Sequence, residues 1–85
     1  MTTFAIIAPA GDARLQTAVA KLFPAKNFEI APGQFVVSAA GLTASQVSAN
    51  LGDDTKVGQY VVFAVAGYWG YHRKDLWEWL TANPD

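Results

Sequence analysis

The stretch that decides the fold is Phe28–Ala39, FEIAPGQFVVSA. A tight turn needs a residue whose φ angle is fixed, followed by a residue that tolerates a positive φ. Pro32 and Gly33 supply these two residues in that order. The residues before this turn alternate between apolar and polar, and those after it form a nearly continuous apolar run. The segment therefore predicts a β-hairpin in which an edge strand, 28–30, is followed by a central strand, 34–39.

Helical patterns lie on both sides of this hairpin. Before it, apolar residues recur at helical spacing and predict a helix over residues 13–23, which Asp12 can cap. After it, Thr43 and Gln46 have the spacing of a capping box, in which each side chain satisfies the other residue's backbone N–H. This box predicts a second helix over residues 44–51.

Two more apolar strands complete the pattern, over Phe4–Ala8 and Tyr60–Ala66. The residues between the second helix and the last strand predict a polar loop over Asp53–Gly58. A short helix from about Leu76 to Ala82 is expected at the end, opened by a second capping box. That box consists of Asp75 and Glu78.

The order of these elements predicts an α+β fold with a single domain over residues 1–85. The first six elements, βαββαβ, match the ferredoxin-like arrangement, in which two helices lie on one face of a four-stranded antiparallel sheet. We expect the strand order 4-1-3-2, and the short C-terminal helix is an addition to this arrangement.

The strands are apolar on both faces, although two helices can cover only one. In the last strand, Val61, Phe63 and Val65 point to one side while Tyr60 and Val62 point to the other. A sheet with one solvated face alternates apolar and polar residues instead. A second cover is therefore expected: either the aromatic segment Gly67–Trp79, folded back as a lid, or the sheet of a second subunit.

Composition narrows the classes of function. The chain is 52% hydrophobic and 15% charged, has a net charge of −1 and contains no cysteine. Because there is no cysteine, disulfides and thiolate chemistry are excluded. Because the net charge is slightly negative, no positive electrostatic field of the whole protein attracts nucleic acid. No run approaches the ~20 apolar residues that span a bilayer, and the first residues lack the basic region of a signal peptide. A soluble, cytoplasmic protein without membrane association is expected.

The sequence offers few candidates for chemistry. His72 is the only histidine and is followed by Arg73 and Lys74, so a surface position is expected rather than a catalytic one. The pair Asp53-Asp54 lacks the pattern of a calcium loop. We expect no catalytic residue, no metal and no cofactor, and hence no enzyme.

The sequence pattern FVVSAAGLTASQVSANLG, followed by the apolar YVVFAVAGYWG, resembles that of small bacterial ferredoxin-like proteins related to the CRISPR adaptation subunit and the SinR-like family. The resemblance covers about residues 3–66. Nucleases of that group carry a metal-binding aspartate at the end of the first strand, where this chain has Ala8. The resemblance therefore implies domains that pair through their sheets, without nuclease activity.

These observations predict a non-enzymatic, homo-oligomeric protein-interaction or accessory domain, and a homodimer is the expected assembly. Two alternatives stay open: a catalytically inactive nucleic-acid-binding relative of the adaptation subunit, and a small-molecule binder that uses the aromatic loop. Another protein is a possible partner, whereas nucleic acid is disfavoured. The candidate interface residues are apolar or aromatic residues of the last strand and the loop after it, with two neighbouring basic residues: Tyr60, Val62, Tyr68, Trp69, Tyr71, His72 and Arg73.

Overall fold

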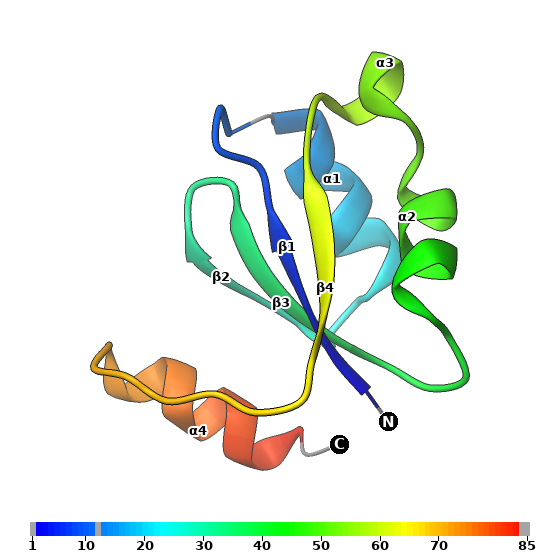
Figure 1. Ribbon diagram of the computed structural model, residues 1–85. Coiled ribbons are helices and arrows are strands. Elements are labelled where there is room, and N and C mark those ends of the chain that lie inside the picture. The colour runs from blue at the N-terminus through cyan, green and yellow to red at the C-terminus, as the bar shows by residue number, and fades with distance from the viewer. Residues whose placement is uncertain (1, 12, 84–85) are drawn as a thin grey trace.

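The computed structural model describes residues 2–11 and 13–83, so the predicted cap Asp12 lies outside the described residues (Figure 1). Four strands and four helices follow one another in the described chain. In order they are β1 (Thr2–Ile7), α1 (Ala13–Leu22), β2 (Asn27–Ala31), β3 (Gln34–Ala39), α2 (Ala44–Leu51), α3 (Asp54–Val57), β4 (Val61–Val65) and α4 (Lys74–Ala82).

The four strands form one sheet in the order β2-β3-β1-β4, and every neighbouring pair is antiparallel. Read from the β4 edge, the order is β4-β1-β3-β2. The α+β class with a four-stranded antiparallel sheet is thus confirmed, together with the C-terminal helix. The predicted hairpin is present, since Phe28 of β2 lies opposite Val36 of β3.

The turn between β2 and β3 is fixed by Gly33. This residue has φ +77°, and a Cβ there would collide with the carbonyl oxygen of Ala8. The Ala8 N–H donates to the Gly33 carbonyl at 2.7 Å. The turn is therefore joined to the end of the neighbouring strand β1, and only glycine fits this close approach.

One face of the sheet, called here the inner face, is closed by α1 and α2. Alternate side chains of β1 and β3 point to it, and apolar residues of both helices pack against them. The largest fully buried side chains all belong to this cluster: Phe4, Ile6, Leu15, Val19, Val37 and Val47.

The helix α2 has the predicted ends. The Thr43 hydroxyl accepts from the Gln46 N–H at 3.2 Å, and the Gln46 side chain accepts from the Thr43 N–H at 2.8 Å. The predicted polar loop after α2 instead contains the four-residue helix α3, which begins after Asp53 and buries Val57 in the inner cluster. Four residues are too few for a helical periodicity to be visible in the sequence.

The opposite, outer face is partly covered by α4, which lies by β2 on the other side of the sheet from α1 and α2 (Figure 1). Leu76 and Leu80 are buried against Val36, and Trp79 lies with its ring centroid 6.3 Å from that of Phe28. We call this cluster, Leu76 and Leu80 with Val36, Phe28, Ile30, Trp77 and Trp79, the α4 cover.

The start of α4 differs from the prediction. Arg73 precedes the first helical residue and makes no side-chain capping bond, so the expected capping box is wrong. The helix begins one residue before Asp75, whose carboxylate instead lies 3.5 Å from the Arg73 side chain. Glu78 lies 3.6 Å from Lys74, one helical turn away. Both acids therefore form exposed ion pairs rather than caps.

Candidate interaction surface

The half of the outer face that α4 leaves uncovered belongs to β1 and β4. The register places Ala5 between Val36 on one side and Phe63 on the other, so one cross-strand row runs from the α4 cover to the open edge. The neighbouring rows add three aliphatic residues. We call the resulting set the open half-face: Ala5, Ile7, Val61, Phe63 and Val65.

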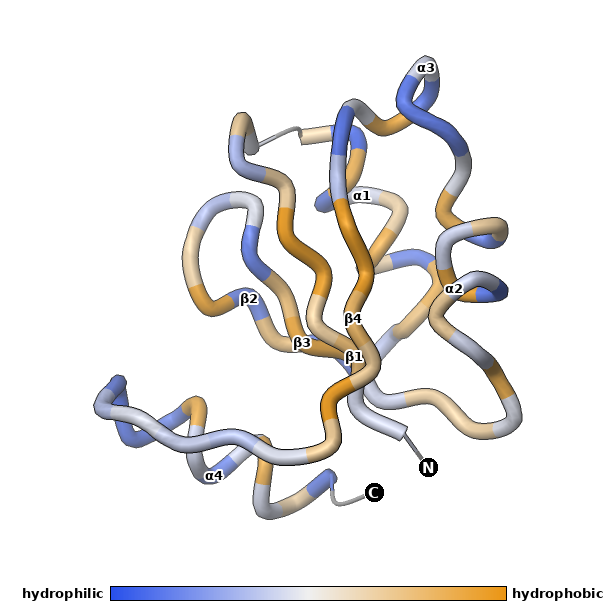
Figure 2. Tube along the Cα trace, in the orientation of Figure 1, coloured by the Kyte–Doolittle hydropathy of each residue, from blue (hydrophilic) through white to orange (hydrophobic). Residues whose placement is uncertain are grey.

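The open half-face is apolar and partly accessible: Ala5, Ile7 and Val65 are half-buried, and Thr3, which points the same way from β1, is buried. Phe63 is 55% exposed and Val61 43%. None of the five side chains is charged, although charges usually protect an exposed sheet edge such as β4. Figure 2 shows β1 and β4 as strongly hydrophobic segments, with no other element of the chain drawn in front of them.

The aromatic loop that follows β4 is not a lid over the sheet. Trp69 is 92% exposed, Tyr71 is 99% exposed and Tyr68 is 50% exposed. The expectation of a lid is therefore wrong for the loop and right only for the helix after it. Leu76 and Leu80 supply the burial, and the segment that joins β4 to α4 stays outside.

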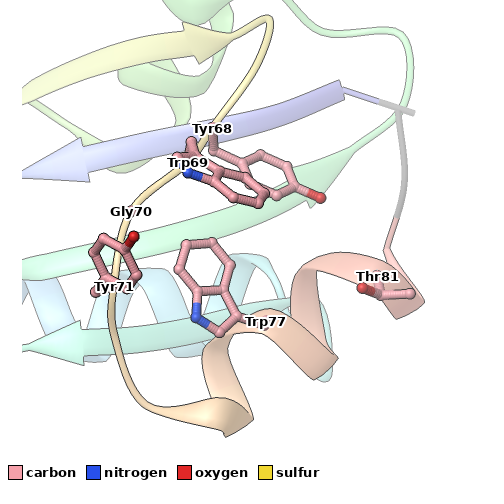
Figure 3. Close-up of a pocket in the computed structure, with 6 residues that line it drawn as sticks. All are labelled: Tyr68, Trp69, Gly70, Tyr71, Trp77 and Thr81. Atoms are coloured by element: carbon pink, nitrogen blue, oxygen red, sulfur yellow. The ribbon is translucent and has the colours of Figure 1, made fainter.

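The loop and α4 together line a half-open hollow of about 400 Å³ (Figure 3). The rings of Tyr68 and Trp77 are stacked, with centroids 6.2 Å apart and planes inclined by 26°. Tyr71 stands at another side of the same hollow, and Trp69 also lines it. We call this the aromatic pocket, and its lining is mostly apolar: Tyr68, Trp69, Gly70, Tyr71, Trp77 and Thr81.

The cations beside the aromatic pocket are balanced by acids. Arg73 pairs with Asp75, and Lys74 pairs with Glu78. The Arg73 guanidinium also lies over the ring of Phe28, 5.8 Å from its centroid. His72 is exposed. The surface thus carries aromatic rings without the excess of positive charge that binders of single-stranded nucleic acid have.

Two of the sequence candidates lie elsewhere. Tyr60 and Val62 pack against the inner cluster, so they are not part of the open half-face. The Tyr60 hydroxyl lies 2.8 Å from the Ser48 hydroxyl and 2.7 Å from the Gly52 carbonyl oxygen at the end of α2. Tyr60 therefore fixes the start of β4 to the helix beneath it.

The candidates from the loop do come together, but three accessible or pocket-lining residues were missed: Val61, Phe63 and Trp77. The first two carried a usable signal, because the alternation along the last strand places them opposite Tyr60 and Val62. The third lies on α4 and was assigned only to an aromatic segment. Its position facing the loop depends on tertiary packing.

The structure also locates the residues on which other kinds of site would depend. Ala8, which follows the last residue of β1, is buried. In residues 2–11 and 13–83 there is no group of three His, Asp or Glu residues able to hold a metal ion. Within the same residues, no helix has the length and apolarity to cross a membrane. Asp53 accepts from the Thr55 hydroxyl and N–H, and the first of these bonds lowers the pKa of its carboxyl most.

Comparison with known proteins yields no match to any family model, curated protein or solved structure.

Proposed function

We propose that this chain is a non-enzymatic interaction domain that forms a homodimer through its outer face. The observation that carries the proposal is the open half-face, an uncharged strip over β1 and β4 that adjoins the exposed aromatic loop. Large exposed apolar patches on single domains mark interaction sites. A two-fold pair is the commonest way in which identical chains bury such a surface.

The accessible area is of the size that a dimer needs. A fully buried aromatic side chain contributes roughly 150–250 Å². The exposed fractions of Phe63, Tyr68, Trp69 and Tyr71 therefore amount to roughly 450–750 Å² per subunit, before the aliphatic residues are counted. Interfaces of standard size bury ~800 Å² per partner.

The ferredoxin-like assignment and the relationship to the adaptation-subunit group belong to this proposal as well. The ferredoxin-like assignment is supported by the βαββαβ order and by the uniformly antiparallel sheet, and the relationship to the adaptation-subunit group is supported by the sequence pattern alone. In this assignment α3 is an insertion before the last strand, and α4 is an appended helix.

Sedimentation equilibrium over a range of concentrations tests the proposal. The apparent mass is expected to rise from the monomer value of 9.1 kDa toward twice that value. Phe63→Lys places a charge in the open half-face and is expected to return the chain to a monomer. Leu22→Lys changes an exposed apolar residue on α1 and should leave the dimer intact. A mass that stays at the monomer value at every concentration would overturn the proposal.

A further inference from the structure

The outer face of a single subunit contains both a projection and a hollow. The projection is Phe63, the largest side chain of the open half-face, 55% exposed and directly opposite the small Ala5. The hollow is the aromatic pocket of about 400 Å³ between the loop and α4. Both consist of apolar groups, so joining them would bury no unpaired charge.

We infer that, in the dimer, Phe63 of each subunit occupies the aromatic pocket of the other. This inference rests on the proposed function, because it requires a second copy of the chain. It specifies which surfaces meet: the aromatic pocket of one subunit lies over the open half-face of its partner, and the reverse contact is made at the same time.

The shape of the outer face supports this pairing. The α4 cover stands over β2 and β3 as a raised part, and the exposed Val61 and Phe63 of β4 form the bare part beside it. The loop joins the two parts, running from the end of β4 to the start of α4 (Figure 1). Consider a two-fold axis that lies in the plane of contact, along the boundary between the raised part and the bare part. Rotation about this axis places the raised part of each subunit over the bare part of the other. Such an interface is self-complementary, as two-fold symmetry demands.

The chemistry of the pocket supports the same occupant. Its walls are aromatic. The stacked rings of Tyr68 and Trp77 form one wall, and the ring of Tyr71 forms another. Aromatic rings pair favourably beyond the area that they bury. Strong interfaces typically place one aromatic anchor into a pocket near the centre of the contact. Phe63 is the aromatic residue of the open half-face and is therefore the natural anchor.

A double-mutant cycle on dimer dissociation tests the contact. Phe63→Ala and Trp69→Ala both truncate exposed side chains, so the isolated subunit should keep its fold. Each is expected to raise the dissociation constant by about 30-fold or more, as loss of an interface anchor does. If the two side chains meet, the double variant should be only slightly weaker than either single variant.

The control is Leu22→Ala, which truncates an exposed residue of α1 and should leave the dissociation constant unchanged. Losses that multiply fully in the double variant would show that the two residues act independently, and would overturn the inference while leaving the dimer itself in place. A chain that is monomeric throughout would overturn the proposed function and the inference together.

Cysteine cross-linking provides a second test, because the chain has no cysteine of its own. Val61→Cys labels the open half-face two residues from Phe63, and Thr81→Cys labels the aromatic pocket. A short bismaleimide should link a mixture of the two variants into a covalent dimer, and should link neither variant to itself. Efficient linking of Val61→Cys alone would show that two open half-faces or two β4 edges pair directly, which contradicts the inference.

Discussion

The two faces of the sheet are built from the same kinds of residue and end in different states. On the inner face, α1 and α2 bury Phe4 almost completely. On the outer face, α4 covers the strands β2 and β3, while Phe63 of β4 stays more than half exposed. The difference follows from the number of helices that pack on each face rather than from their length. In the described chain, α1 and α2 together close the inner face, whereas α4, which is as long as either of them to within a residue, covers only β2 and β3 on the outer face.

The largest expected effect comes from matching truncations on the two faces. Phe4→Ala removes a side chain from the closed inner cluster and should lower the free energy of unfolding by about 3–5 kcal/mol. Phe63→Ala should lower it by less than about 1 kcal/mol, because that side chain already contacts solvent. Urea denaturation of dilute protein, where dimers are few, measures both. Equal losses would show that the open half-face is closed within one subunit.

A smaller effect is expected from the α4 cover. Leu80→Ala removes a buried contact with Val36 and should cost about 2–4 kcal/mol. Because the α4 cover is a cluster separate from the inner one, the loss should appear first as local opening. Hydrogen exchange should accelerate at the amides of α4 and remain slow in β1 and β3. Glu78→Ala on the exposed side of the same helix serves as the control. Uniform acceleration would indicate that the two faces unfold as one unit.

The hydrogen bonds of Tyr60, which attach the start of β4 to the end of α2, are expected to make a moderate contribution to the free energy of unfolding. Tyr60→Phe removes the hydroxyl that bonds the end of α2, where helix carbonyls otherwise lack partners. The expected loss is about 1–2 kcal/mol in the free energy of unfolding, measured by thermal or urea denaturation. Tyr71→Phe changes a hydroxyl on a fully exposed ring and should have no effect on dilute protein. Indistinguishable values for the two variants would remove this role for Tyr60.

The smallest expected effect is a change in the pKa of Asp53, which precedes α3 and lies on neither face of the sheet. The Thr55 hydroxyl donates to Asp53 and lowers the pKa of its carboxyl. A folded-state pKa below the unfolded one gives stability that is present above the unfolded pKa and lost as the pH falls through the folded one. Carbon-detected NMR titration should show a higher Asp53 pKa in Thr55→Val, with no change in Thr81→Val. An unchanged pKa in Thr55→Val would contradict the assigned cause.

Much of this fold could be predicted from local patterns. The Pro32-Gly33 turn, the capping box of Thr43 and Gln46, and the two-sided apolar strands each have one dominant physical cause that lies within a few residues. The helix α3 lacked such a pattern, although Asp53 and Gly58 at its ends are typical capping residues. The start of α4 was misplaced because an acid such as Asp75 also suits the first turn of a helix that it does not cap, and Glu78 also suits an i, i+4 ion pair with Lys74.

The candidate surface was less predictable, since it depends on what the folded chain leaves uncovered. Aromatic composition identified Tyr68, Trp69 and Tyr71 but could not tell whether they are buried or exposed. Their exposure follows from the path of the loop between β4 and α4, which tertiary packing sets. The candidates Tyr60 and Val62 lie on the inner side of β4, whereas the accessible Phe63 lies on the other side of the same strand.

The central position of β1 has a consequence for the rate of folding. Both of its neighbours in the sheet come much later in the chain, and Thr3 pairs with Val65, more than sixty residues away. A long loop must close before these pairs form, so folding should be slower than that of a helical bundle of equal length. Until β4 arrives, one side of β1 has no strand to pair with. Dilute conditions during refolding should therefore raise the yield of native protein, because they limit pairing of this edge between chains.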